Sequence, residues 1–458
     1  MPKRAYHTTR RQGMQPEALW DERWETEVVP RLPSEMESQA RELKAFVRVR
    51  EVMCVSDLLR ALLAYVLGAT SFRRLGMWAV LVGVATLSEA AWRKRLRKAS
   101  AWLLWLLGEL LAVPEQARWL EGRVTGRVLL VDATRLREPG GCGDDWRVHT
   151  AYDLRRGRLA EVTVTDRHEA ESLRHFQLRA GDIVVADNGY GYRRSVATVR
   201  ACQADGVFRI TPCSFPLEDE HEQPIDVLRW LRRRGASQRS LACWCRWQGQ
   251  RSAVRLIALK LSPERARQAR AAKVQKAKKK GHAITDETIF VAGWVLLITT
   301  LPEEQWSSEE VLRLYRARWQ IELVYKRMKQ LLPLAHLRSA HVESVQATIR
   351  LMLIAWVLQE EEASQIRAQL SQVIQTSGTP AEAMEAAVIS SWLLTGLCLE
   401  TLRQQVQGGW TRARLRACLP KLRRYLVSRP RKRVHQESTI RAWLAPPSRK
   451  GRTHAHAC

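Results

Sequence analysis

Two short apolar runs, each leading into an aspartate, constrain the fold of this chain more than any other feature. The first is RVLLVDATRL at residues 127–136, whose apolar part ends at Asp132, and the second is GDIVVADNGYG at residues 181–191, which ends at Asp187. Runs that are apolar on both faces are typical of central strands covered by helices. Around them the pattern predicts strands at 147–154, 158–166 and 207–211, and helices at 170–179 and 193–206. We therefore expect an α/β layer.

The α/β pattern is interrupted between about residue 212 and residue 290. This stretch is polar, contains the strand-like pieces SLACWCRW and RSAVRLIAL, and then carries eight Lys or Arg between Arg265 and Lys280. A basic run of this kind is commonly a flexible, solvated segment. The pattern resumes with the apolar strand FVAGWVLLITTLP at residues 290–302. An insertion that is mostly β is therefore expected to split the α/β domain.

The cysteines and the apolar runs limit the class of protein. The nine cysteines are an odd number scattered along the chain, which indicates reduced thiols. Cys243 and Cys245 are close together, but alternation along a strand explains this pair better than zinc, because no second pair lies at ligand spacing. The apolar runs at 77–87 and 101–113 are shorter than the roughly 20 residues that a membrane helix needs. The opening residues carry charge with no apolar signal core behind them. We expect a cytoplasmic protein without membrane contact.

The charge of the chain points to a polyanionic partner. Lys and Arg number 75 against 47 Asp and Glu, which gives a formal net charge of +28. Nucleic acid is a more probable partner for such a globular chain than a membrane surface. A predicted helix at 87–107 presents Arg93, Lys94 and Arg97 within two turns, either as a solvated face or as a surface that faces DNA. A basic tail follows Pro420 and is expected to add non-specific affinity.

One helix carries a glutamate among cations. The segment LYRARWQIELVYKRMKQLL at residues 314–332 contains Tyr315, Arg318, Glu322 and Lys329. With about 100° per helical residue, all four side chains fall within an arc of about 60°, beside an apolar face. A solvated, salt-bridged helix face is the ordinary interpretation of such a stripe. The segment should form one continuous helix that begins at Ser307 or Ser308 as its N-cap.

The glutamate gains a sharper interpretation from the two strand-end aspartates. If Asp132, Asp187 and Glu322 converge at one edge of the sheet, three carboxylates would supply the hard oxygen ligands that Mg²⁺ or Mn²⁺ prefers. Two such ions can activate the attacking oxygen and stabilise the leaving oxygen in phosphodiester cleavage. Three histidines also occur in this region, but strand and helix positions explain them without a zinc site: His149, His168 and His175.

These residues together resemble a known family. YRARWQIELVYKRMK matches all four positions of the Y-x₂-R-x₃-E-x₆-K signature of DDE-type transposases in the insertion sequence 4 family. The segments VLLVDATRL, RVHTAYDL, VVADNGYGY and WVLLITTLP resemble other blocks of the family in the same order, over about residues 45–360. Two positions depart from the family: Ala133 stands where Gly is often seen, and Asn188 where Arg is often seen. Neither change removes a carboxylate.

The resemblance implies an RNase H-like catalytic core split by a mostly β insertion, with helical N- and C-terminal regions. The expected parts are a tail (1–15), a helical DNA-binding domain (16–122), the first part of the core (123–211), a β-rich insertion with the basic segment (212–289), the second part of the core (290–345), a C-terminal helical region (346–428) and a basic tail (429–458). The C-terminal helices would help a homodimer to form on two DNA ends.

The resemblance also implies a chemistry. Two Mg²⁺ ions, with Mn²⁺ as a substitute, would be held by Asp132, Asp187 and Glu322. The substrates would be double-stranded DNA with terminal inverted repeats and a target DNA. The expected DNA contacts come from Tyr315, Arg318 and Lys329 near the cut, and from Arg93, Lys94 and Arg97 away from it.

Trp294 has two interpretations. It lies at the start of the strand WVLLIT, and the ordinary one is a tryptophan in the core. In relatives, a tryptophan at this motif position stacks on a base flipped out near the cut during formation of a DNA hairpin. Stacking on an indole can offset part of the few kcal/mol that base extrusion costs.

We therefore expect a DNA transposase that moves an insertion sequence by cut-and-paste. Two alternatives remain at this point: a structure-specific nuclease on the same RNase H-like fold, and an inactivated transposase that acts as a DNA-binding regulator. Strand transfer of cut ends would distinguish a transposase from the nuclease, and DNA binding without cleavage would indicate the regulator.

Overall fold

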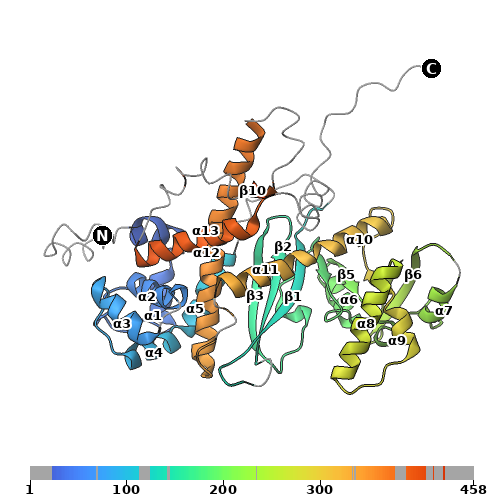
Figure 1. Cartoon of the computed structure of the whole chain (residues 1–458), viewed down its shortest axis with the longest axis horizontal. Coiled ribbons are helices and arrows are strands. Elements are labelled where there is room, and N and C mark those ends of the chain that lie inside the picture. Colours follow the sequence, from blue (N-terminus) through green and yellow to red (C-terminus); the bar gives the residue numbers. More distant parts are fainter. Residues whose placement is uncertain are drawn as a thin grey trace. The chain divides into compact units, whose positions relative to one another are not determined.

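The computed structural model describes residues 23–68, 71–112, 124–141, 145–233, 235–332, 334, 337–376, 388–408, 416 and 427–428. The expected tails at 1–15 and 429–458 lie outside the described residues. The chain divides into two compact units (Figure 1). The first comprises residues 1–113, 136–143 and 326–430, and the second comprises residues 114–135, 144–325 and 431–458.

The second unit is built on one eight-stranded sheet with the order β3-β2-β1-β4-β5-β8-β7-β6 (Figure 1). Strands β1, β4 and β5 are parallel, whereas the pairs β2–β3, β5–β8, β8–β7 and β7–β6 are antiparallel. The strands are β1 (Val128–Leu136), β2 (Trp146–Asp153), β3 (Arg158–Asp166), β4 (Ile183–Ala186), β5 (Asp205–Arg209), β6 (Gln238–Trp247), β7 (Gln250–Lys260) and β8 (Trp294–Thr299). The strands predicted around the two aspartates are therefore confirmed.

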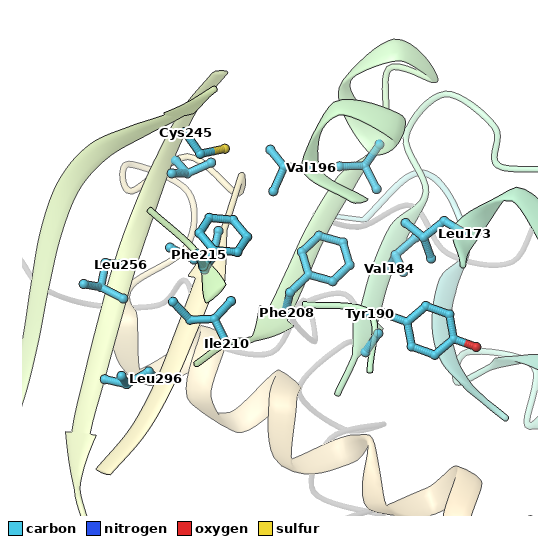
Figure 2. Packing of buried hydrophobic residues seen from close by; sticks show 14 of the residues in the cluster. Leu173, Val184, Tyr190, Val196, Phe208, Ile210, Phe215, Cys245, Leu256 and Leu296 are labelled. Carbon is cyan, nitrogen blue, oxygen red and sulfur yellow. The ribbon is translucent and has the colours of Figure 1, made fainter. Parts of the chain in front are cut away.

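A continuous apolar core lies against this sheet. Figure 2 shows side chains from α6 (Arg193–Ala201), β5, β7 and β8 directed into it, among them Val196, Phe208, Leu256 and Leu296. Cys243 and Cys245 on β6 are 1% and 2% exposed and belong to the same core. The strand interpretation of this pair is confirmed, because both cysteines lie on β6.

The predicted helix at 170–179 is wrong. The structure has a single 3₁₀ turn there, η5 (Leu173–His175), and the chain is extended at Phe176. The side chains of β3 supply partners that a helix would have supplied internally: the Thr163 hydroxyl donates to the carbonyl of His175 (3.0 Å), and the Gln177 N–H donates to Glu161 (2.6 Å). The segment is thereby held along β3 instead of coiling.

The insertion is mixed α/β rather than mostly β. The hairpin β6–β7 extends the main sheet through β8 and does not form a sheet of its own. Helices α7 (Val227–Arg232), α8 (Pro263–Lys279) and α9 (Asp286–Val291) make up much of the rest. The basic run, expected to be flexible, is the helix α8. Ser262 caps it, Pro263 and Glu264 occupy its first turn, and Ala, Arg, Lys and Gln are good helix formers.

The first unit is helical. Its N-terminal elements are η3 (Trp24–Val28), η4 (Val29–Arg31), α1 (Met36–Glu42), α2 (Val55–Leu67), α3 (Phe72–Leu81), α4 (Glu89–Lys98) and α5 (Ser100–Leu111). Its C-terminal elements are α12 (Val342–Thr376), β9 (Val388–Ile389), α13 (Ser391–Gln407) and β10 (Val427–Ser428). No helix within the described ranges is long and apolar enough to cross a membrane.

The N- and C-terminal helices, expected as separate regions, fall in one unit. Helix α12 packs on α2, α4 and α5, and α13 packs on α2 and α12. Buried arginines join the two ends of the chain: Arg350 donates to the carbonyl of Ser100 (2.7 Å), and Arg60 donates to the carbonyl of Val406 (2.9 Å).

Candidate active site

The register of two parallel strands places the two aspartates side by side. The pairs between β1 and β4 run from Val128↔Ile183 to Val131↔Ala186, so Asp132 and Asp187 are the next residues along both strands. Paired residues of parallel strands direct their side chains to the same face. The expectation that both aspartates end their strands holds only for Asp187, because β1 continues to Leu136, with β2 as its neighbour on the other side.

The environment of Asp132 makes its carboxyl harder to ionise than that of an exposed aspartate. Burial raises the pKa of this carboxyl most, and the negative charges of Asp187 and Glu171 raise it further. The N–H of Ala133, which donates to Asp132 (2.8 Å), and the charge of Arg318 act in the opposite direction. The resulting pKa is about 7. A group of carboxylates that repel one another in this way gains from a bound cation.

The helix that carries Glu322 is divided in two. Helix α10 (Ser308–Ala317) ends and α11 (Trp319–Leu331) begins around Arg318, so the prediction of one continuous helix is wrong. At the junction the N–H groups of Arg318 and Ile321 bond to carbonyls three residues back (both 3.1 Å), as in a tightened 3₁₀ turn. The predicted start is confirmed, because Ser307 caps α10 and forms a capping box with Glu310.

Arg318 connects Glu322 with Asp132. Its Nη2 donates to Glu322 Oε1 (2.6 Å), and its Nη1 lies 3.8 Å from Asp132 Oδ2. The guanidinium carbon also lies 5.9 Å from the centre of the Tyr315 ring. The structure thus brings Tyr315, Arg318 and Glu322 together beside the first aspartate. Lys329 lies further along α11, in the part of this helix that belongs to the first unit.

Tyr325 positions α11 on the sheet, a role that was not predicted from the sequence. Its buried hydroxyl donates to the backbone carbonyl of Asp132 (2.8 Å) and bonds to the Thr150 hydroxyl. Glu322 lies one turn earlier on the same helix, so this anchor fixes the helix that presents the glutamate. A tyrosine within an apolar helix face was the sequence signal for this role, because a buried tyrosine hydroxyl needs a polar partner.

A fourth carboxylate, Glu171, stands beside the aspartate pair. A Cβ added to Gly189 would lie 1.9 Å from Glu171 Oε2 and 3.1 Å from Asp187 Oδ1, so both carboxylates approach this glycine closely. Tyr190 is fully buried, and its hydroxyl has no hydrogen-bond partner among the described residues. Burial, followed by Glu171 and the two aspartates, raises the pKa of this hydroxyl. Glu171 was missed because it falls in the segment that was expected to be a helix.

The residues fit a divalent cation, with one condition. Among the described residues, no three His, Cys, Asp or Glu side chains are placed as a complete metal cluster. Asp132 and Asp187 are nevertheless adjacent, half-buried carboxylates with hard oxygen donors, and Arg318 pairs with Glu322 and lies 3.8 Å from Asp132. The condition is that Arg318 releases Glu322.

The contacts of His149 and His175 indicate structural roles for both histidines. The rings of His149 and His175 stack with their centres 4.1 Å apart, and His149 Nε2 bonds to the Thr165 hydroxyl (2.9 Å). Burial, the neighbouring ring of His175 and nearby arginines lower the pKa of His149 to about 3. These positions on β2 and η5 agree with the interpretation that needs no zinc.

Trp294 lies in the core. It is the first residue of β8, its side chain is 5% exposed, and it belongs to the apolar cluster against the sheet. The Arg239 guanidinium lies 5.4 Å from its ring, and Phe290 lies 6.5 Å away between ring centres. Stacking on a DNA base would require this ring to leave its neighbours.

The remaining predicted contacts lie on α4 of the first unit. Arg93 and Lys94 are exposed, and Arg97 is half-buried. The Nε of Arg97 donates to the Ser344 hydroxyl at the start of α12 (3.2 Å).

A parallel strand pair with adjacent aspartates, followed by a helix that presents a glutamate, is the arrangement of a DDE enzyme. Residues 124–358 match the family described as the transposase DDE domain. The chain belongs to this family, whose fold is RNase H-like and whose members catalyse DNA cleavage and strand transfer, generally with divalent metal ions. It is a DNA transposase.

Two relatives from Escherichia coli show the extent of the similarity. The putative transposase InsL for insertion sequence element IS186A, of strain K12, is 35% identical over 331 residues, which cover 70% of this chain and 89% of the relative. The transposase for insertion sequence element IS421 is 35% identical over 332 residues, with the same coverage.

Proposed function

We propose that this chain is the transposase of an insertion sequence of the insertion sequence 4 family, and that it moves the element by cut-and-paste. It cuts DNA at the terminal inverted repeats and joins the freed 3′ ends to a target DNA. The observation that carries the proposal is the alignment of Asp132 with Asp187, together with the tether of Glu322 through Arg318. The contacts of Arg318 with Tyr315 and Glu322, three residues that the resemblance assigns to the family signature, support the proposal.

Asp132, Asp187 and Glu322 are the residues that would hold two Mg²⁺ ions, for which Mn²⁺ would substitute. Bound ions of this kind supply Lewis-acid activation of the attacking and leaving oxygens. The protein residues contribute position: the β1–β4 register aligns the aspartates, and Tyr325 anchors α11, the helix that carries Glu322.

Arg318 has a different partner in the DNA-free chain from the one it has in the proposed complex. In the structure it pairs with Glu322 and lies near Asp132. A DNA phosphate offers the guanidinium an alternative charged acceptor. Entry of the scissile phosphate would draw Arg318 away and leave Glu322 open to a cation. Tyr315 and Lys329 are expected to contact phosphates close by, and Arg93, Lys94 and Arg97 to contact the inverted repeat.

One experiment tests the proposed function. Purified protein is mixed with Mg²⁺, a plasmid that carries the DNA flanking its gene, and a target plasmid. Joining of excised 3′ ends to the target supports the transposase, and cleavage without joining indicates a nuclease on the same fold. Binding without cleavage indicates the inactivated, regulatory alternative. The mass of the complex on paired DNA ends tests the homodimer.

Arg318→Ala is expected to weaken DNA binding and its dependence on salt. If Arg318 contacts one phosphate, the slope of log affinity against log salt should fall by about 0.9. The measurement is a salt titration with an inverted-repeat duplex. Arg313→Ala is the matched control, because Arg313 is exposed on α10 and pairs with Glu309 (2.5 Å). Equal slopes for wild type and Arg318→Ala would mean that Arg318 serves only its carboxylate partners.

Trp294→Leu tests the two interpretations of this tryptophan. Leucine keeps an apolar side chain in the core, so we expect a modest destabilisation, on the order of 1–3 kcal/mol, from the smaller volume. If the indole also stacks on a flipped base, the variant should nick DNA normally and form hairpins more slowly. An abasic nucleotide at the flipped position should then restore part of the hairpin rate. Hairpin formation at the wild-type rate would assign Trp294 to the core alone.

A further inference from the structure

A cavity of about 470 Å³ lies within the first unit, apart from the candidate active site. It opens between the end of α2, the start of α3, one face of α4, and residues 337–348, where α12 begins. Arg93 and Arg97 of α4 and Arg338 line it, so the cavity gathers residues from two segments some 240 positions apart in the sequence.

The cavity has a strong positive charge. Among the residues that the structure describes, three guanidinium groups and one carboxylate, that of Glu89, line it. This carboxylate is already engaged, because Arg73 Nε donates to Glu89 Oε1 (2.8 Å). Arg93 and Arg338 line this cavity together with Tyr65; burial raises the pKa of the Tyr65 hydroxyl, and the charges of both arginines act in the opposite direction. Like charges brought together in this way favour a bound anion.

The walls of the cavity suit a phosphate that carries a sugar. Its apolar side is the stacked pair of Tyr65 and Phe72, with ring centres 4.4 Å apart and planes 9° from parallel. Its polar side is the first part of α12, where the Ser344 hydroxyl accepts the Nε of Arg97 (3.2 Å). The N–H groups in the first turn of a helix lack partners within the helix and favour an anion. Three cations, a hydroxyl and a helix start therefore face one concave surface.

We infer that this cavity binds one backbone phosphate of the DNA, with its sugar, through Arg93, Arg97 and Arg338. The inference rests on the proposed function and deepens it. Of the three cations on α4 that are proposed to contact DNA, it assigns two to one phosphate and leaves out the third. Arg93 and Arg97 line the cavity together with a residue that the sequence pattern did not connect to them, whereas Lys94 does not line it. A phosphate bound here holds the DNA at a fixed position and carries no base information.

The test compares arginines inside and outside the cavity. Binding of an inverted-repeat duplex is measured in EDTA over a salt series, so that cleavage plays no part. Arg93→Gln and Arg338→Gln should each lower affinity about five- to tenfold at low salt and reduce the salt slope by about 0.9. Arg74→Gln is the matched control: Arg74 is an exposed arginine on α3 that does not line the cavity. Thermal unfolding of each variant verifies that the fold is retained.

The outcomes separate this inference from the proposed function. If wild-type protein binds the duplex but Arg93→Gln and Arg338→Gln behave like Arg74→Gln, the cavity assignment is overturned and the transposase remains. If wild-type protein does not bind the duplex at all, the proposed function fails first. A second arm adds inorganic phosphate alone and follows thermal unfolding. Stabilisation by phosphate that is lost in Arg93→Gln, together with unchanged DNA binding, would overturn the DNA assignment in favour of a free-phosphate site.

Discussion

Asp132→Asn, Asp187→Asn and Glu322→Gln should each abolish DNA cleavage and leave binding of DNA ends largely intact. An amide keeps the shape of the carboxyl group but loses the charge that attracts a divalent cation. Metal-assisted stabilisation of a phosphodiester transition state contributes several kcal/mol, so we expect a loss on the order of a thousandfold or more in rate. The measurement is single-turnover nicking of a plasmid that carries the element's ends, beside gel-shift binding of the same DNA.

Asp205→Asn is the matched control for these variants. Asp205 begins β5, on the same sheet, and its carboxylate accepts the Thr300 hydroxyl (2.7 Å). Asp205 pairs across the sheet with Ile183, the first residue of β4, whereas Asp187 follows the last residue of β4. The two aspartates therefore lie at opposite ends of this strand. The same chemical change there should leave cleavage near the wild-type rate. Any of the three site variants that cuts as fast as wild type would lose its assigned role.

The local parts of the fold could be predicted from the sequence. Apolar runs with aspartates at their ends gave the strands β1 and β4, and Ser307 with Glu310 gave the start of α10. These signals depend on residues close together in the chain. The pairing of Asp132 with Asp187 depends instead on the register of two strands, and the sequence pattern could suggest only that they share an edge.

The parts that could not be predicted depend on distant partners. The helix breaks at Arg318, whose side chain pairs with Glu322 on α11 and lies near Asp132 on β1. The extended segment that carries Glu171 bonds to side chains of β3, which outweigh its helical pattern. The hairpin β6–β7 extends the main sheet because β8 returns beside β5, a non-local pairing. Tyr325 gains its role only from contact with the first two strands.

Arg127→Met should destabilise the second unit by about 3–5 kcal/mol, because breaking a buried ion pair leaves an uncompensated charge. Arg127 Nη2 pairs with Asp182 Oδ2 (2.6 Å), and its Nη1 pairs with Glu161 Oε1 (2.9 Å). Asp182 is only 1% exposed. Methionine preserves much of the apolar stem, so the loss of charge dominates. Urea unfolding followed by tryptophan fluorescence measures the change.

This ion pair also bears on the active site. Arg127 precedes β1 and Asp182 precedes β4, and the pair has the same 55-residue offset as the strand register that aligns Asp132 with Asp187. A slip of one residue between the strands would turn one aspartate to the other face of the sheet. The pair at one end of the strands therefore holds the register that the carboxylates at the other end need.

The double variant Arg127→Met, Asp182→Asn separates charge from packing. Of the two carboxylates that the single variant leaves without an ion-pair partner, it removes the buried one, Asp182, so it should recover part of the lost free energy of unfolding. Asp182 accepts the backbone N–H of residue 127 at Oδ1 (3.1 Å) and that of Arg179 at Oδ2 (2.8 Å), and asparagine, with one acceptor oxygen, can keep only one of these two bonds. If the double variant is as unstable as Arg127→Met alone, packing of the arginine stem would be the main contribution. If Arg127→Met lowers the free energy of unfolding by less than about 1 kcal/mol, strand pairing alone fixes the register of β1 and β4. The Arg127–Asp182 ion pair would then be a consequence of that register and not its cause.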